Sequence, residues 1–440
     1  MGMPNPSSMN RRQLLSAGAS LAALPALAEN APPSPKKFGP NDKIRVALIG
    51  AGGSRGGFRQ GLGDTINISR QPGVEIAAVC DVDLLHLDEA ANVFKRKDGA
   101  LPDKYTDFRY VLARPDIDAV VIGTPDHWHS IIGSHAMKSG KDVYCEKPMT
   151  LMIGEGIELV KTARKMGTVW QTGSQQRSDQ RFRKACELVR NGRLGKIKQV
   201  VAHLPGGTRG GPFDVVEKPH DFLFDMWQGP TKPVPYLEER THGSFRHWYA
   251  YSGGMMTDWG AHHLDISQWG LGRDGSGPVK IKSEGTMPAP DPGRRSFEAA
   301  LSFKVTYTYA DGVELIATNE GENGVHFYGE NGTWIFVSRG TIQASDPKLL
   351  DEPLPSGATK LYASDNHHGN FIECVRSRQR PICDVEIGHR SASVCHLGNL
   401  SIRLGFKELH WDPKKETFVG ENAAEANALK FVPYHGGWSL

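Results

Sequence analysis

The sequence has little that would place the protein in a membrane, on nucleic acid or in a disulfide-stabilised scaffold. The apolar run that ends at Ala28 is about fifteen residues long, shorter than the roughly 20 that a membrane-spanning helix needs. The formal net charge is only +3 and no dense Lys/Arg stripe occurs, so attraction to phosphate backbones is weak. The six cysteines include no C-x-x-C pair, which argues against a zinc ribbon or a disulfide framework. We therefore expect a globular protein with no stable membrane span and no nucleic-acid partner.

The N-terminal segment is typical of an export signal. Arg11 and Arg12 precede the apolar run, which ends in the small-residue cleavage pattern Ala26-Leu27-Ala28. The pattern predicts a twin-arginine signal over residues 1–28, a Pro-rich tether over residues 29–41 and a periplasmic location. A membrane anchor is the alternative interpretation. Removal of the signal deletes two arginines and no acid, so the net charge falls from +3 to +1.

Two patterns of secondary structure predict two domains. Over residues 42–165, short β-branched apolar runs alternate with helical segments, which predicts an α/β Rossmann domain with a doubly wound parallel sheet. Over residues 166–440, alternating segments separated by hairpin-type turns such as Asp311-Gly312 predict an α+β domain with a large, mostly antiparallel sheet. The predicted strands of the first domain are 43–50, 74–81, 117–123 and 142–145.

A glycine turn after the first predicted strand indicates a dinucleotide site. Gly50, Gly52 and Gly53 would allow backbone N–H groups to approach a pyrophosphate closely at a helix N-terminus. The third glycine of the G-x-G-x-x-G pattern is replaced by Arg55, which we interpret as a turn expanded by one residue. A plain glycine turn is the alternative.

The end of the second predicted strand favours NAD over NADP. Asp81 would accept hydrogen bonds from both hydroxyls of the adenosine ribose and would repel a 2′-phosphate. Arg55 in the glycine turn would favour a phosphate, so NADP is the less favoured alternative.

Several ordered motifs resemble one oxidoreductase family. The segments Thr124–His129 (TPDHWH) and Glu146–Pro148 (EKP) are similar to those of the glucose-fructose oxidoreductase, inositol dehydrogenase and rhizopine-catabolism family, written Gfo/Idh/MocA. The similarity continues through residues 171–177, 245–248 and 253–265. In that family the EKP lysine and the Asp and His of a D-x-G-x-H segment surround the reacting carbon beside the nicotinamide.

The resemblance implies that Lys147, Asp258 and His262 are the catalytic residues. His262 would take the hydroxyl proton as hydride leaves the carbon. Lys147 would stabilise the developing alkoxide charge. Asp258 lies four residues before His262, so on a helix it would share a face with the imidazole and orient it or bind a neighbouring hydroxyl.

The remaining predicted contacts follow from these motifs and from the chemistry of sugar recognition. The residues predicted to contact the dinucleotide are Gly50, Gly52, Gly53, Ser54, Arg55, Asp81, Thr124, Pro125, His129, Glu146, Lys147 and Gln175. Proteins bind sugars through forked polar groups, such as the guanidinium of arginine, and through aromatic faces. The residues predicted to contact substrate are therefore Arg177, Arg246, Trp248 and His263. No metal is expected, since neither His127-x-His129 nor the adjacent His262 and His263 has the spacing of a zinc site.

The sequence thus predicts an exported NAD-dependent oxidoreductase that acts on a secondary carbinol of a sugar, glycoside or cyclitol. We expect tight cofactor binding, because free NAD is scarce outside the cytoplasm. Two alternatives stay open: a redox-neutral NAD-dependent glycosidase or lyase that acts through a transient keto-sugar, and a non-catalytic dinucleotide-binding sensor. In the resembling family the large sheet often pairs with a copy of itself, which implies a homo-oligomer.

Overall fold

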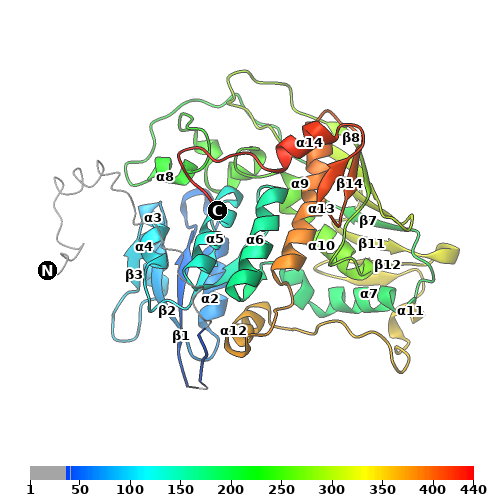
Figure 1. Ribbon diagram of the computed structural model, residues 1–440, viewed down its shortest axis with the longest axis horizontal. Coiled ribbons are helices and arrows are strands. Elements are labelled where there is room, and N and C mark those ends of the chain that lie inside the picture. The colour runs from blue at the N-terminus through cyan, green and yellow to red at the C-terminus, as the bar shows by residue number, and fades with distance from the viewer. Residues whose placement is uncertain (1–35, 40) are drawn as a thin grey trace. The chain divides into compact units, whose positions relative to one another are not determined.

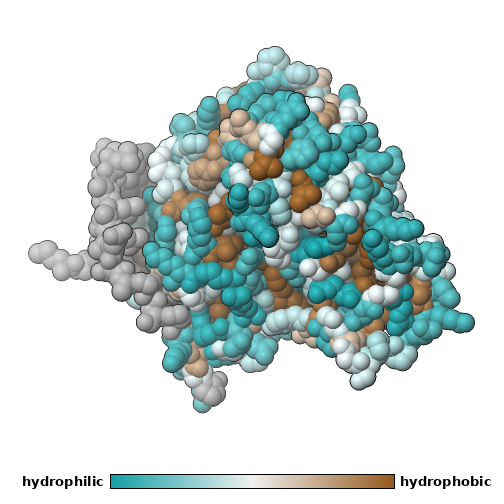
Figure 2. Space-filling model, turned by 45° about the vertical axis from the view of Figure 1, so that its right-hand side comes forward, coloured by the Kyte–Doolittle hydropathy of each residue, from teal (hydrophilic) through white to brown (hydrophobic). Residues whose placement is uncertain are grey.

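The computed structural model describes residues 36–39 and 41–440 (Figure 1). The predicted export signal and most of the predicted tether lie outside the described residues. Within the described ranges, no helix is both long and apolar enough to cross a membrane. On the face drawn in Figure 2, hydrophilic side chains predominate and hydrophobic ones lie in several separate patches.

The N-terminal domain is built on a parallel sheet of six strands in the order β3-β2-β1-β4-β5-β6. This confirms the predicted doubly wound sheet. The sheet continues to Thr172, beyond the predicted domain end at residue 165. Its strands are β1 (Ile44–Ile49), β2 (Val74–Cys80), β3 (Asp103–Tyr105), β4 (Ala119–Ile122), β5 (Asp142–Cys145) and β6 (Trp170–Thr172).

Helices cover both faces of this sheet, which explains why β4 and β5 are buried along their whole length. One face packs against α2 (Gln60–Ser69), α3 (Leu84–Val93) and α12 (His367–Ser377). The other face packs against α4 (Phe108–Leu112), α5 (Asp126–Lys138) and α6 (Ile153–Met166). α12 comes from the C-terminal half of the chain, so the two domains share a hydrophobic core.

The C-terminal domain contains a nine-stranded sheet in the order β13-β12-β11-β7-β10-β9-β8-β14-β15. The pairing of β7 with β10 is parallel and the other pairings are antiparallel, which confirms the predicted sheet type. The strands are β7 (Gln199–His203), β8 (Lys280–Thr286), β9 (Ser302–Thr308), β10 (Glu314–Thr318), β11 (Gly324–Tyr328), β12 (Trp334–Val337), β13 (Ile342–Ala344), β14 (Leu409–Asp412) and β15 (Thr417–Val419).

One face of the large sheet is covered by three helices, α7 (Gln180–Arg190), α10 (Gly260–Leu271) and α13 (Val385–Arg403). Alternate residues of β9 are buried, as expected for a sheet with one face packed and one face exposed. α13 also packs against α6, which ties the two domains together (Figure 1). This contact between the domains positions the cavity described next.

The segment between β7 and α9 (Met255–Asp258) returns to the N-terminal domain. It carries a separate aromatic cluster that includes Phe222, Trp227 and Trp248. Phe222 forms a β-bridge with Asp83, directly after β2. The segment therefore crosses the carboxyl end of the parallel sheet.

Candidate active site

A cavity of about 750 Å³ lies at the carboxyl ends of the parallel strands and is lined by both domains. The order β2-β1-β4 reverses direction at β1, and ligands of doubly wound sheets bind outside the strand ends at such a point. The predicted residues that line the cavity are Gly50, Gly52, Asp81, Thr124, Pro125, His129, Glu146, Lys147, Gln175, Arg246, Asp258 and His262.

The glycine turn has the close packing that a dinucleotide site requires. Gly50 has a left-handed φ of 80°, and a Cβ there would lie 2.6 Å from the backbone nitrogen of Thr124. Gly52 has a φ of 65°, and a Cβ there would lie 2.2 Å from the carbonyl oxygen of Phe58. A larger residue at either position would collide with neighbouring backbone, so glycine is required for the tight turn through which a dinucleotide can approach the strand end.

The turn is longer than the G-x-G-x-x-G pattern, and by more than the one residue that we expected from the sequence. A short 3-10 segment, η3 (Arg55–Gly57), precedes α2, which begins at Gln60. Gly61 takes the place of the third glycine in helix–strand packing, because a Cβ there would lie 2.1 Å from the carbonyl oxygen of Gly50. The sequence analysis missed Gly61, although it falls directly after the glycine turn.

Asp81 lines the cavity and also holds the glycine turn in place. Its Oδ2 accepts hydrogen bonds from the backbone nitrogens of Ala51 at 2.8 Å and Gly52 at 3.2 Å. Its Oδ1 accepts one from the backbone nitrogen of Asp83 at 2.9 Å. Burial raises the pKa of the Asp81 carboxyl.

Three of the residues predicted to contact the cofactor lie outside the cavity lining: Gly53, Ser54 and Arg55. The backbone nitrogen of Ser54 donates to Glu89 at 2.9 Å. Arg55 turns toward the C-terminal domain, where its guanidinium contacts both oxygens of Asp221 at 2.9 Å. The longer turn carries these residues past the strand end, where Ser54 and Arg55 bind other parts of the protein.

Lys147, Asp258 and Arg246 meet in the cavity although they come from three separate segments. Lys147 directly follows β5, and its Nζ donates to Oδ1 of Asp258 at 2.8 Å and to the Asp258 carbonyl oxygen at 3.1 Å. Nε of Arg246 donates to the same Oδ1 at 3.0 Å. Burial alone would raise the pKa of Asp258, but the charges and hydrogen bonds of Lys147 and Arg246 outweigh burial and hold this pKa below its ordinary value. Asp258 is therefore an anion between two cations.

His262 reaches the same cavity from α10. α9 and α10 are separated by Trp259, whose φ of −84° and ψ of −30° are helical, so Asp258 and His262 lie one turn apart as predicted. Burial, followed by the charges of Lys147 and Arg339, holds the pKa of His262 well below its ordinary value. The imidazole is therefore neutral, and its buried Nδ1 has no hydrogen-bond partner among the described residues. Among the described residues, the Asp258 carboxylate accepts from Lys147 and Arg246 and makes no hydrogen bond with the His262 ring.

Asp126 and Arg339 are cavity residues that the sequence analysis missed. Asp126 is buried, and its Oδ2 accepts a hydrogen bond from the hydroxyl of Ser252 at 2.5 Å. Burial raises the pKa of Asp126 to about 7. Asp126 lies soon after β4, at a strand's carboxyl end, and this position could have identified it from the sequence. No sequence pattern distinguished Arg339, whose guanidinium stacks on Trp259 at 4.7 Å.

A buried carboxyl pair, Glu146 and Asp64, forms another wall of the cavity. Gln175 donates to Glu146 at 2.8 Å, and His368 contacts Asp64 at 2.8 Å. Burial and the neighbouring Asp64 raise the pKa of Glu146 to about 8, and burial raises that of Asp64 to about 6. The pair therefore retains a proton at neutral pH. Asp64 lies in α2, and no sequence pattern distinguished it.

Of the four predicted substrate contacts, Arg246 lines the cavity, whereas Arg177, Trp248 and His263 do not. Arg177 is 1% exposed, and its guanidinium binds Asp265 at 2.8 Å and Asp274 at 2.7 Å, as a structural ion pair.

The other two residues outside the lining are equally buried. Nε1 of Trp248 donates to the carbonyl oxygen of Glu239. His263 contacts the amide oxygen of Asn323 and points away from the cavity, because one residue along a helix turns the side chain by roughly 100° from His262.

Two family models match most of the chain. The model described as "Oxidoreductase family, NAD-binding Rossmann fold" matches residues 44–174, and that described as "Oxidoreductase family, C-terminal alpha/beta domain" matches residues 210–440. The N-terminal domain is thus an NAD-binding Rossmann domain, and NAD is the cofactor.

The curated relatives are named glycosyl hydrolase family 109 proteins. One from Shewanella pealeana is 29% identical over 270 residues, which are 56% of this chain and 52% of the relative. One from Shewanella sp. strain ANA-3 is 36% identical over 176 residues, 36% of this chain and 37% of the relative. The chain thus spans about half the length of the first of these relatives, and less of the second.

Solved structures share the fold at low sequence identity. An aldose-aldose oxidoreductase from Caulobacter crescentus, complexed with glycerol, is 18% identical with a TM-score of 0.60, covering 84% of this chain and 99% of that one. The WlbA dehydrogenase from Bordetella pertussis, in complex with NADH and UDP-GlcNAcA, is 18% identical with a TM-score of 0.61, covering 84% and 99%. With both family models matched in order along a Rossmann domain and a large mostly antiparallel sheet, the chain belongs to the Gfo/Idh/MocA oxidoreductase family.

Proposed function

We propose that the protein transfers hydride between NAD and a secondary carbinol of a sugar, glycoside or cyclitol. The observation that carries the proposal is that neutral His262 and the Lys147–Asp258 ion pair face the same cavity as the glycine turn. The oxidation of an alcohol needs a proton acceptor, a positive charge that stabilises the alkoxide and a bound dinucleotide, all close together. In this cavity, His262, Lys147 and the glycine turn would meet these three needs.

The residues have distinct roles in the proposed reaction. When bound, NAD supplies the hydride acceptor, with its pyrophosphate at Gly50 and Gly52. His262 accepts the hydroxyl proton, since a neutral imidazole has a free lone pair for it. Lys147 stabilises the negative charge that develops on the carbinol oxygen, and Asp258 holds the Lys147 ammonium in position.

The chemistry of the cavity wall supports a polyhydroxylated substrate. Arg246 and Arg339 present charged hydrogen-bonding groups, Asp126 presents a carboxyl group, and Trp259 presents an aromatic face. Solved structures with this fold include one named an aldose-aldose oxidoreductase and one in complex with a nucleotide sugar.

We further propose that NAD stays bound through catalytic cycles, in a periplasmic protein exported by the signal at residues 1–28. Support comes from the strap, residues 219–223, which crosses the end of the cavity beside β2. The backbone nitrogen of Leu84 donates to the carbonyl oxygen of Asp221, and that of Leu223 donates to the carbonyl oxygen of Val82, both at 2.9 Å. Arg55 adds an ion pair from the glycine turn to Asp221. Release of a dinucleotide would require these contacts to open.

A redox-neutral glycosidase or lyase is the second candidate. It is favoured by the glycosyl hydrolase names of the curated relatives and by carboxyls in the cavity that hold protons near neutral pH. A protonated carboxylic acid can donate a proton to a leaving-group oxygen, which oxidation alone does not require.

Product analysis distinguishes the candidates. Nucleotide released from the purified protein would be identified by mass spectrometry, and a panel of sugars, glycosides and cyclitols would then be screened for products. A keto-sugar with an equal amount of NADH supports the oxidoreductase, and a free aglycone without net NADH supports the glycosidase or lyase. Protein that neither contains nor binds a dinucleotide would refute both.

A further inference from the structure

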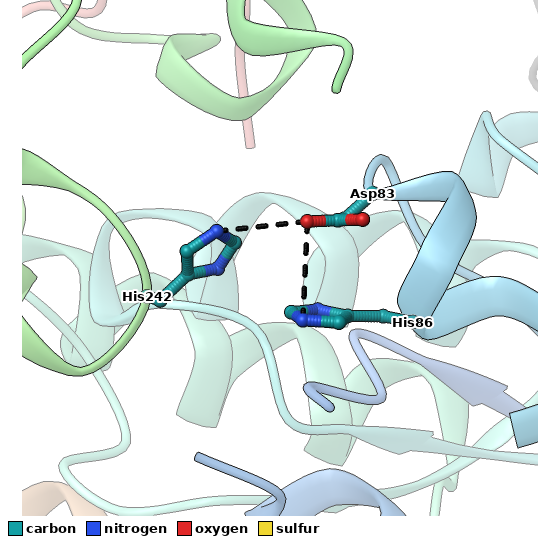
Figure 3. Close-up of side chains that lie close together, drawn as sticks. All are labelled: Asp83, His86 and His242. Atoms are coloured by element: carbon teal, nitrogen blue, oxygen red, sulfur yellow. Dashed lines mark ion pairs between the residues drawn. The ribbon is translucent and has the colours of Figure 1, made fainter. Parts of the chain in front are cut away.

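Three potential metal ligands converge beside the glycine turn, outside the catalytic group (Figure 3). Asp83 is the N-cap of α3, and His86 lies in the first turn of that helix. His242 begins η6 (His242–His247) and comes from the C-terminal domain. Their ligand atoms all lie within 4.8 Å of one another.

The separations of these atoms suit a shared ion better than direct hydrogen bonds. Nε2 of His242 lies 3.6 Å and Nε2 of His86 lies 3.8 Å from Oδ2 of Asp83, both too long for a hydrogen bond. Zinc bonds of roughly 2.0–2.1 Å in a tetrahedral site place neighbouring ligands about 3.4 Å apart. Nε2 of His86 donates a hydrogen bond to the carbonyl oxygen of Arg55 at 3.0 Å, and zinc would displace this proton on binding.

His242 occupies a backbone conformation that is costly without a compensating interaction. Its φ is 49°, in the left-handed region, and its Nε2 is buried with no hydrogen-bond partner among the described residues. A Cβ on Gly56 would lie 2.4 Å from the His242 Cβ, so glycine at that position permits the approach.

We propose that Asp83, His86 and His242 bind a zinc ion. The donor set of two imidazoles and one carboxylate is typical of zinc or a similar divalent transition metal. The ion would connect the glycine turn, α3 and the C-terminal domain at the edge of the dinucleotide cavity. It is separate from the proposed hydride-transfer centre and does not depend on it.

In the absence of zinc, the guanidinium of Arg55 is the cation that pairs with Asp83. Its Nη1 donates to Oδ2 of Asp83 at 2.8 Å, where zinc would bind. Its Nη2 contacts both oxygens of Asp221, so the guanidinium keeps a full ion pair when it gives up Asp83. Zinc and the Arg55 guanidinium therefore compete for Asp83.

Calorimetric titration of Zn²⁺ into chelator-treated, tag-free full-length protein tests the proposal. We expect one zinc per chain and, with Co²⁺ as a probe, the visible absorption of a tetrahedral site. His242→Asn removes the imidazole while tolerating the left-handed backbone, and Asp83→Asn keeps the helix cap while removing the charge. Each variant should bind zinc at least about 100-fold more weakly, since even outer ligand partners contribute roughly 10–100-fold.

A matched control and two further readouts complete the test. His410→Asn alters an exposed histidine beside Glu408 and should leave zinc affinity unchanged. Arg55→Gln should tighten zinc binding, because the competing cation is lost. Zinc should raise the melting temperature of the wild-type protein but not of His242→Asn. Absence of stoichiometric zinc binding, or equal affinity in wild type and His242→Asn, would overturn the proposal.

Discussion

Replacing Asp258 by Asn tests whether the charge cluster in the cavity is arranged as described. The Asp258 carboxylate accepts hydrogen bonds from Lys147 at 2.8 Å and Arg246 at 3.0 Å, and all three side chains are 13–15% exposed. The substitution leaves two nearly buried cations without an anion. Breaking such a pair from one side costs about 3–5 kcal/mol. An Asn oxygen can still accept one hydrogen bond, so we expect a loss near 3 kcal/mol in the free energy of unfolding at neutral pH.

The pH dependence of this loss gives a sharper check. Because the folded-state pKa of Asp258 is lowered, its ion pairs stabilise the fold above the unfolded-state pKa of roughly 3.9. That stabilisation disappears as the pH falls through the lower, folded-state pKa. The difference between wild type and Asp258→Asn should therefore be full at neutral pH and shrink progressively below about pH 4.

Guanidinium unfolding followed by tryptophan fluorescence measures this difference at a series of pH values. The control is Asp88→Asn, which removes an exposed ion pair with Lys104 and should change stability by no more than about 1 kcal/mol. A difference below about 0.5 kcal/mol between wild type and Asp258→Asn at neutral pH, or one that persists unchanged in acid, would refute the reasoning.

Three further predictions concern the dinucleotide and the reaction. His262→Ala should lower kcat by about 10²–10⁴-fold while nucleotide content, measured by mass spectrometry, stays at the wild-type level; retained turnover would exclude His262 as the proton acceptor. Asp221→Asn should speed nucleotide release in stopped-flow chase experiments by about 5–30-fold, the factor for 1–2 kcal/mol, because the strap loses its ion pair to the glycine turn. Gly61→Ala should weaken NAD binding measured by calorimetry, since the new Cβ would lie 2.1 Å from the Gly50 carbonyl oxygen. The control is Gly63→Ala in the same helix, whose new Cβ would have no neighbouring atom within 4 Å and should leave NAD affinity unchanged. Equal NAD affinity in the two glycine variants would contradict the packing role of Gly61.

The fold could be predicted because it depends on patterns among residues that are close together in the sequence. Continuous apolar strands alternating with helices required a parallel sheet covered on both faces, and the structure has that sheet. Short strands such as β3 and β6 were missed, because three residues are too few to show a period. The predicted domain boundary was placed before β6 for the same reason.

The site was predictable where a motif specifies backbone position. Lys147 lies two residues after a parallel strand, and Asp258 and His262 lie one helical turn apart, so strand-end and helix geometry place them. Arg177 and His263 belong to similar motifs but face the protein interior. Only the packing of the helices decided which side chains reached the cavity.

By itself, the sequence determined the two sheet types, the glycine turn after β1 and the segments that carry the proposed catalytic residues, because each depends on residues close together in the chain. The tertiary structure alone decided the joining of Lys147, Asp258 and Arg246, the substitution of Gly61 for the missing third glycine, and the convergence of Asp83, His86 and His242. These features depend on how distant segments pack and on how far each side chain is rotated about its helix. Neither the packing of distant segments nor the rotation of a side chain about its helix can be read from the periodicity or local spacing of the sequence.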